Sequence, residues 1–200
     1  MKTQLIISIK IFAVLTVLCG IIYPLFITGV AQFVFPAKAN GSLIVQGNKV
    51  IGSELIGQKF DSEIYFWSRP SATDYNTLPS GGSNLGPTSS KLKQMLADRS
   101  AQFARINQLS DSETIPSEML MASASGLDPH ISPEAAMLQV GRIVKARQFN
   151  EQQRQQLEKI ITDQTEAPQF SFLGETRINV LKLNLALDRL NNQSTNAKNL

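Results

Sequence analysis

The sequence has very few residues that could form disulfides or transition-metal sites. Of its 200 residues, one is a cysteine, Cys19, and one is a histidine, His130. Cys19 lies in an apolar N-terminal run, so the rest of the chain has no cysteine for a disulfide. A structural or catalytic zinc ion needs several cysteine, histidine or carboxylate ligands, and a single histidine does not supply them. The sequence therefore excludes a disulfide-stapled scaffold and argues against a zinc enzyme.

Several catalytic motifs are also absent. There is no D-K-T-G string, so this chain cannot by itself be a P-type pump. The glycines Gly82 and Gly86 are not followed by the Gly-Lys-Ser/Thr of a phosphate-binding loop. Ser123, Asp128 and His130 lie within eight residues, but triad members rarely lie so close, and Ala122 breaks the G-x-S-x-G pattern of hydrolases. This stretch is better interpreted as a polar turn or a partner-facing loop.

The small net charge gives no sign of a nucleic-acid partner. The formal charge is +3, and residues 1–37 contribute two of these charges through Lys2 and Lys10. The remaining residues are close to balanced, and no basic stripe with interleaved aromatic residues occurs.

The N-terminus carries a long apolar run. No charged residue occurs between Lys10 and Lys38, and Leu5 to Phe26 would span about 33 Å as a helix, which fits a bilayer core. A cleavable signal peptide is the alternative, because Ala37-Lys38-Ala39 looks like a cleavage site, but signal cores are much shorter. Residues 1–37 are therefore predicted to be a cytoplasmic N-terminus with an uncleaved anchor. Lys2 and Lys10 place the N-terminus in the cytoplasm of a single-pass protein of the cytoplasmic (inner) membrane.

Residues 38–190 are predicted to form one extracytoplasmic domain of mixed α/β (α+β) class. Two strands, 43–46 and 49–51, flank a Gly-Asn turn, and further strands are expected at 64–67, 118–125 and 178–181. Helices are expected from Thr88 or Ser89 onward, from Ser132 to about Phe149, after Asn150, and over 182–190. Residues 191–200 are predicted to be a polar, frayed tail.

A loop of more than 20 residues, 68–90, lacks any periodicity, and loops of that length are usually functional or disordered. Together with the polar stretch 123–130, it supplies the residues predicted to face a partner: Arg69, Ser71, Gly81, Gly82, Asn84, Ser125, Asp128 and His130.

Strings spread along the whole chain resemble one family. They include Tyr23-Pro24-Leu25 with Thr28-Gly29 in the anchor, Arg69-Pro70-Ser71-Ala72, Ser80-Gly81-Gly82-Ser83-Asn84-Leu85-Gly86-Pro87-Thr88, Ala122-Ser123-Ala124-Ser125-Gly126-Leu127-Asp128-Pro129-His130, and Leu183-Asn184-Leu185-Ala186-Leu187-Asp188. In this order they resemble the KdpC family, the small subunits of bacterial potassium-transporting P-type ATPases.

The resemblance implies a subunit of a complex rather than an enzyme in its own right. The expected partners are a channel-like KdpA subunit, an ATP-hydrolysing KdpB subunit and a small KdpF subunit. The complex handles ATP and potassium, and no cofactor or metal is expected on this chain itself. The family is described as a catalytic chaperone that raises the ATP affinity of KdpB, and the residue matching its proposed nucleotide-assisting glutamine is Gln139.

The predicted topology conflicts with direct contact between Gln139 and cytosolic ATP, because residues after about 36 are expected outside. An effect on ATP affinity would then act indirectly, through coupling between sites. The competing function is a stand-alone, membrane-tethered domain outside the cytoplasm that binds or hydrolyses a ligand, with the 68–90 loop lining its pocket.

Overall fold

The computed structural model describes residues 2–110 and 112–198. By its internal contacts the chain divides into two compact units, Met1–Ser53 and Glu54–Leu200. The boundary expected between residues 37 and 38 stays a prediction, because such a division does not show where a membrane surface lies.

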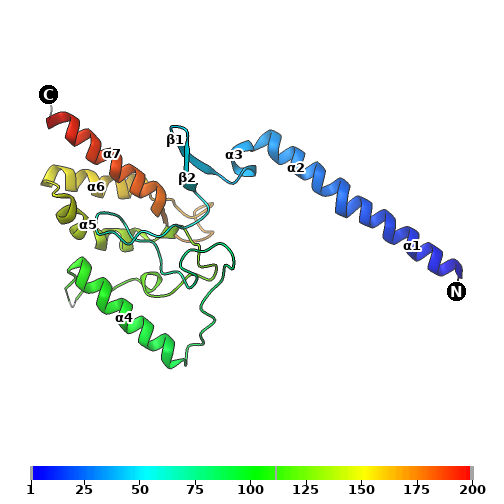
Figure 1. Cartoon of the computed structure of the whole chain (residues 1–200), viewed down its shortest axis with the longest axis horizontal. Coiled ribbons are helices and arrows are strands. Elements are labelled where there is room, and N and C mark those ends of the chain that lie inside the picture. Colours follow the sequence, from blue (N-terminus) through cyan, green and yellow to red (C-terminus); the bar gives the residue numbers. More distant parts are fainter. Residues whose placement is uncertain (1, 111, 199–200) are drawn as a thin grey trace. The chain divides into compact units, whose positions relative to one another are not determined.

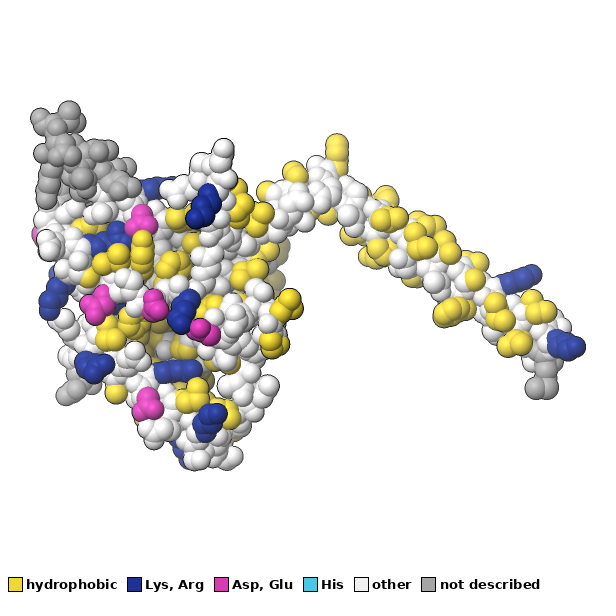
Figure 2. All heavy atoms as spheres, in the orientation of Figure 1, with side chains coloured by type: hydrophobic (Ala, Val, Ile, Leu, Met, Phe, Trp, Pro, Cys, Tyr) yellow, Lys and Arg dark blue, Asp and Glu magenta, His cyan; other side chains and the backbone are white. Residues whose placement is uncertain are grey.

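The first unit begins with one continuous helix, Lys2–Val34, which is long and apolar enough to cross a membrane. It consists of α1 (Lys2–Val17), a π-helical turn η1 (Leu18–Ile22) and α2 (Tyr23–Val34). Hydrophobic side chains cover this helix on the face shown in Figure 2, and the cationic side chains there lie toward its N-terminal end. Exposed apolar residues occur all along it, from Leu5 to Val34, and such a surface is typical of a helix that contacts lipid.

The π-helical turn has a local cause. Proline lacks a backbone N–H and its ring clashes with the carbonyl one turn earlier, so a regular helix does not pass through Pro24 undisturbed. The N–H of Tyr23 donates to the carbonyl of Leu18, five residues back, and this wider turn carries the helix past the proline.

A short helix and a hairpin complete the first unit. Helix α3 (Pro36–Ala39) precedes strands β1 (Leu43–Gln46) and β2 (Lys49–Ser53), which pair antiparallel. Gly47 has a φ of +62°, as a tight two-residue turn requires. The hairpin predicted from the sequence is confirmed.

The second unit is mainly helical. In Figure 1, helices α7 (Val180–Lys198), α6 (Glu151–Asp163), α5 (Pro133–Arg147) and α4 (Ser90–Asn107) follow one another across the unit. A 3₁₀ turn, η2 (Ser117–Met119), and one small antiparallel sheet of β3 (His130–Ile131) and β4 (Ile178–Asn179) complete it. The core consists mainly of apolar residues from α4, α5, α6 and α7, with Phe66 and residues of η2, β3 and β4 added to them. Its fully buried members are Phe66, Ala135, Ala136, Ile143, Leu157, Ile178, Leu183 and Leu187.

Three of the predicted helix starts are confirmed. The side chains of Ser89, Ser132 and Asn150 accept hydrogen bonds from backbone N–H groups in the first turns of α4, α5 and α6. Asn150 and Gln153 form a reciprocal capping box. Helix α7 continues to Lys198, through most of the segment expected to fray, and residues 199–200 lie outside the described residues.

Three strand predictions need correction. Residues 118–125 form part of the turn η2 and then an irregular segment, because their backbone groups bond to scattered loop positions such as Pro70 and Gly81. The last strand stops at Asn179, whose side chain accepts from the N–H of Lys182 and so starts α7 two residues earlier than predicted. Residues 64–67 form no strand, because side chains from α5 and α7 bond their backbone.

The backbone of residues 62–67 is bonded by side chains instead of by a neighbouring strand. The side-chain amide of Asn184 accepts from the N–H of Phe66 (2.8 Å) and donates to its carbonyl (3.0 Å). Gln139 bonds the N–H (2.7 Å) and carbonyl (3.4 Å) of Trp67 in the same way. The two amides therefore replace the ladder partner of a strand.

Two arginines bind the remaining carbonyls of this segment. Arg142 donates to the carbonyls of Ser62, Glu63 and Tyr65, and Arg147 donates to that of Ile64 at 2.8 Å. The guanidinium groups also lie over the rings of Trp67 and Tyr65, at 4.6 and 5.0 Å from their centroids. Helices α5 and α7 thus fix residues 62–67 through polar contacts within the core.

Replacing Asn184 with leucine should strongly destabilise the protein. The variant leaves the buried N–H and carbonyl of Phe66 unpaired, at a cost of roughly 2–5 kcal/mol. The free energy of unfolding of the full chain, measured by urea titration in detergent, checks this. Gln155→Leu on the exposed face of α6 is the matched control and should change stability by less than about 0.5 kcal/mol. Equal effects of the two variants would contradict the proposed role of Asn184.

Candidate functional site

Two loops that lie far apart in the sequence meet in the second unit. The N–H of Gly81 donates to the carbonyl of Ser125 (3.0 Å), and the N–H of Ser123 donates to that of Pro70 (3.3 Å). A Cβ on Gly126 would come within 2.9 Å of the carbonyl oxygen of Gly81, and one on Gly82 within 3.2 Å of that of Ala124. The glycines therefore let the 68–90 loop and the 122–130 segment touch backbone to backbone.

An ion pair lies at the centre of this two-loop cluster. Arg69 Nη1 donates to Asp128 Oδ2 at 2.7 Å, and both side chains are about three-quarters buried. The other oxygen of Asp128 accepts from the backbone N–H of His130 at 3.0 Å and lies 3.4 Å from His130 Nδ1. The structure thus joins Arg69, from the 68–90 loop, to two residues of the polar stretch 123–130.

These contacts decide the ionisation of Asp128. Burial alone would raise its pKa, but the hydrogen bonds from His130 and the charge and hydrogen bond of Arg69 outweigh that effect and lower the pKa to about 2. Asp128 is therefore a permanent anion at physiological pH, which suits a structural ion pair or a contact and not a general acid.

Ser71 and Tyr75 hold the beginning of the 68–90 loop in place. Ser71 Oγ accepts from the N–H groups of Thr73 and Tyr75, and the Tyr75 hydroxyl donates to the carbonyl of Arg69. Asp74 and Tyr75 have φ values of +52° and +61°, a conformation that non-glycine residues adopt at a cost. Burial raises the pKa of Tyr75 to about 12, so its hydroxyl keeps its proton and remains a donor.

Two hollows lie beside the ion pair, and Arg69 and Asp128 line both. One, of about 290 Å³, is lined by Arg69, Glu118, Asp128, His130, Ile131, Ser132 and Glu175 to Arg177. The other, more open, is lined by Leu55, Arg69, Ser123 to Ser125 and Leu127 to Pro129. Arg69 Nε and Ser123 Oγ are buried and have no hydrogen-bond partner among the described residues. Ser123 is thus not bonded to His130, so these residues do not form a hydrolase triad.

Most of the predicted partner-facing residues belong to this cluster. Its contacts join Arg69, Ser71, Gly81, Gly82, Ser125, Asp128 and His130. Asn84 is exposed, with a φ of +54°, and is not among the residues that these contacts join. Within the described residues, no group of three or more histidine, cysteine or carboxylate side chains is placed to hold a metal ion.

Gln139 lies elsewhere, inside the core, with none of its surface exposed. Its oxygen accepts from the Trp67 N–H (2.7 Å) and from Arg142 Nη2 (2.8 Å), and its nitrogen donates to the carbonyls of Ala135 (3.1 Å) and Trp67 (3.4 Å). An amide side chain has two donor hydrogens and two acceptor lone pairs, and these four contacts use all of them.

From the sequence, Arg142 and Arg147 were expected to be solvated or to bond a neighbouring loop, and the structure shows that they bond residues 62–67. The role of Asn184 was not predicted. Arg142 is 3% exposed, and burial lowers its pKa to about 10, with the charge of Glu63 opposing that effect. It also donates to Asn107 Oδ1 at 2.9 Å, which extends the network to α4. One signal in the sequence could have pointed to this network, because polar residues occur on otherwise apolar helix faces. These residues are Asn107, Gln139, Arg142 and Asn184.

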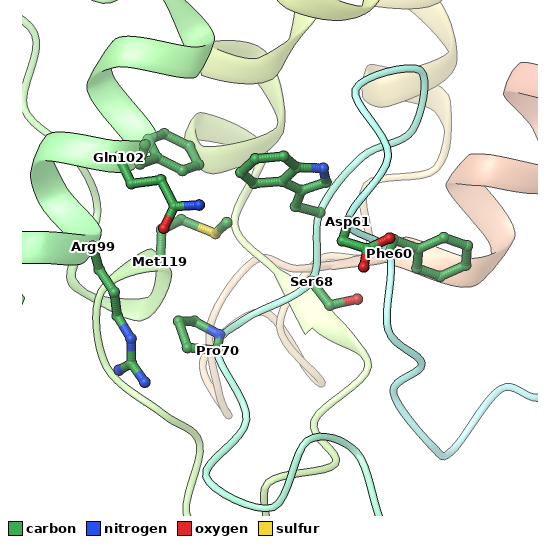
Figure 3. A pocket seen from close by; sticks show the side chains of 9 residues that line it. Phe60, Asp61, Ser68, Pro70, Arg99, Gln102 and Met119 are labelled. Atoms are coloured by element: carbon green, nitrogen blue, oxygen red, sulfur yellow. The ribbon is translucent and has the colours of Figure 1, made fainter. Parts of the chain in front are cut away.

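A further pocket is lined in part by Pro70, the neighbour of Arg69. It encloses about 260 Å³ between Phe60, Asp61, Trp67, Ser68, Pro70, Arg99, Gln102, Phe103 and Met119. Figure 3 shows Arg99 and Asp61 on opposite sides of this pocket, with Pro70, Met119 and Ser68 between them. Arg99 donates to the carbonyl of Leu120 (2.7 Å), and burial lowers its pKa. The pocket is amphipathic, but it has no pair of groups arranged for acid-base or nucleophilic catalysis.

Comparison with known proteins shows which family the chain belongs to. The family described as "KdpC: K+-transporting ATPase, c chain" matches residues 5–189. The chain belongs to the KdpC family. The match includes most of the long apolar helix as well as most of the second unit, so both units are part of the family's common architecture.

Individual relatives agree. The chain is 47% identical over 196 residues to a "Potassium-transporting ATPase KdpC subunit" of Polynucleobacter asymbioticus, covering 94% of this chain and 99% of the relative. Subunits with the same description from Geobacter metallireducens (47%, covering 92% of this chain and 96% of the relative) and Burkholderia mallei (49%, covering 90% and 93%) match as well. The KdpC resemblance stated from the sequence is confirmed.

Replacing Asp128 with asparagine should destabilise the protein in a pH-dependent way. Because its pKa lies below the ordinary value of 3.8, Asp128 contributes stability above about pH 4, and this contribution is lost as the pH falls toward 2. Allowing for solvent screening, the variant should lose roughly 1–2 kcal/mol of unfolding free energy at pH 7 and much less at pH 2.5. Urea titrations of the full chain in detergent at the two pH values measure this.

The exposed carboxylate Asp61 provides the control for this experiment. Asp61→Asn should change stability little at either pH. A loss in Asp128→Asn that is the same at pH 7 and pH 2.5 would show that ionisation of Asp128 is not what stabilises the cluster.

Proposed function

We propose that this chain is a non-catalytic accessory subunit of an ATP-driven, high-affinity potassium uptake pump, required for the assembly and activity of the complex. The observation that carries the proposal is the family match over residues 5–189, together with relatives that are each described as the KdpC subunit of a potassium-transporting ATPase. The proposed partners are a channel-like KdpA subunit, an ATP-hydrolysing KdpB subunit and a small KdpF subunit.

The second unit is proposed to lie outside the cytoplasmic membrane. Lys2 and Lys10 are the only charged residues in the first 37, and basic residues flanking a membrane helix favour the cytoplasmic side. A domain on the opposite side cannot reach cytosolic ATP. ATP and potassium are then bound by the other subunits, and this chain raises ATP affinity only by stabilising a conformation of the complex.

The burial of Gln139 supports an indirect effect. A nucleotide contact would require this side chain to leave contacts with Trp67, Ala135 and Arg142 that use all its hydrogen-bonding groups. We therefore propose that Gln139 determines the shape of the domain, and that the two-loop cluster around Arg69 and Asp128 contacts a partner subunit. Arg69 Nε and Ser123 Oγ, which lack partners among the described residues, are available to a partner that rearranges this surface.

Potassium-stimulated ATPase activity of the membrane-embedded complex tests this proposal. Without this chain the activity should be lost, and adding it back should restore it. Gln139→Leu should reduce the amount of assembled complex, whereas the complex that does assemble should keep the wild-type ATP affinity.

Asn184→Leu provides the comparison, because it removes the other amide of the same network. Both variants should reduce assembly in parallel. A sharp fall in ATP affinity with Gln139→Leu alone, with assembly and potassium affinity unchanged, would contradict the indirect role and favour direct contact with nucleotide.

A further inference from the structure

A short turn in the second unit presents large apolar side chains to solvent. Residues 167–174 join α6 to β4, and within them Phe170, Phe172 and Leu173 are 81%, 75% and 50% exposed. The two phenylalanine rings lie 6.5 Å apart, centroid to centroid. Single exposed apolar residues are common on protein surfaces, but three at one tip mark an interaction site.

Backbone hydrogen bonds hold the turn in a defined conformation. Gln169 and Leu173 pair across it, and the Phe172 N–H donates to the carbonyl of Gln169 at 3.2 Å. Below it, Glu166 and Arg177 pair through their backbones and form an ion pair of 3.1 Å. Between Glu166 and Glu175 there is no charged residue, so an uncharged tip stands on a charged base.

The backbone at the tip has a conformation that disfavours a bulky residue. Phe170 and Ser171 have φ values of +53° and +66°, as in the turns that favour Asn-Gly. A bulky residue adopts this conformation at a cost that glycine avoids. An aromatic ring therefore occupies a position where the backbone alone favours a small residue, and such strain is typical of functional sites.

We propose that the 167–174 turn inserts Phe170, Phe172 and Leu173 into the surface of the bilayer that the anchor crosses. The inference depends on the anchor spanning a membrane and not on the role proposed in the pump. Residues 35–53 separate the membrane helix from the second unit, and even fully extended they reach roughly 65 Å, so the unit stays near the membrane. A short apolar contact by itself binds a bilayer weakly. The anchor holds the turn near the bilayer, so the contact is intramolecular and the effective concentration of the membrane surface is high.

A bilayer suits this tip better than a protein surface does. An aromatic anchor in a protein interface needs a matching pocket on the partner, whereas the interfacial region of a bilayer accommodates a protruding ring without one. The uncharged tip and charged base also match the change from the apolar to the polar region of a membrane surface.

An environment-sensitive fluorophore at the tip tests the proposal in the full chain. Cys19, the only cysteine, is first replaced by alanine, and Ser171→Cys is then labelled, which keeps both phenylalanines. In phosphatidylcholine vesicles, the label should shift its emission to the blue, lose quenching by aqueous iodide and gain quenching by spin-labelled lipid. The same label on Ser83→Cys, another exposed serine, should remain accessible to iodide.

Replacing Phe170 and Phe172 with serine in the labelled chain should return the Ser171→Cys label to water, and this change leaves the buried core untouched. The lipid quenching should also persist in the assembled complex. Iodide access at the tip in both preparations, lipid quenching that survives the double serine substitution, or shielding that appears only when partner subunits are added would each overturn the proposal. The last result would show that the turn docks on protein instead.

Discussion

The fold of the second unit depends on the hydrogen bonds that one irregular segment makes with its backbone N–H and carbonyl groups in the core. Residues 62–67 contribute Phe66, which is fully buried, yet they have no neighbouring strand. Unpaired backbone groups in an apolar interior are costly, so buried N–H and carbonyl groups must find other partners. Asn184, Gln139, Arg142 and Arg147 supply these partners, and since they come from α5 and α7, they fix both helices to the segment.

This network also positions the surface cluster. Trp67 is held by Gln139, and two residues later Arg69 reaches Asp128 at 2.7 Å. Asp128 in turn lies two residues before β3, which pairs with β4 before α7 begins. The chain therefore runs from Trp67, which a buried amide holds, to the partly buried ion pair within two residues. A change in the core would move the surface that we propose as a partner contact. This is how the accessory subunit that we propose would affect the complex without contacting nucleotide.

The parts of the fold that could be predicted from sequence were those with local causes. The long apolar helix follows from an uncharged apolar run, the hairpin from Gly47-Asn48, and the helix starts from Ser89, Ser132 and Asn150. The strand predicted at 64–67 was wrong because its aromatic and β-branched residues do favour strands, but its partners are side chains more than 70 residues away.

In the candidate site, too, local features could be predicted from the sequence and contacts between distant residues could not. The polar strings around Ser125 and Asp128 and around Gly81 stood out in the sequence, and the structure brings them together. Their contact could not be predicted, since the close approach depends on Gly82 and Gly126 facing backbone atoms across the two loops. Gln139 was identified only by resemblance, and its full burial has no signature in the sequence other than apolar neighbours such as Leu138 and Val140.

The central claim is that side chains, acting in place of a strand, hold residues 62–67 in the core. Amide hydrogen exchange of the full chain measures this most directly, because protection reports on the hydrogen bond of each N–H. The N–H groups of Phe66 and Trp67 should exchange as slowly as those in the middle of α5, although they belong to no helix or strand. Exchange as fast as that of the exposed residues 76–80 would contradict the account.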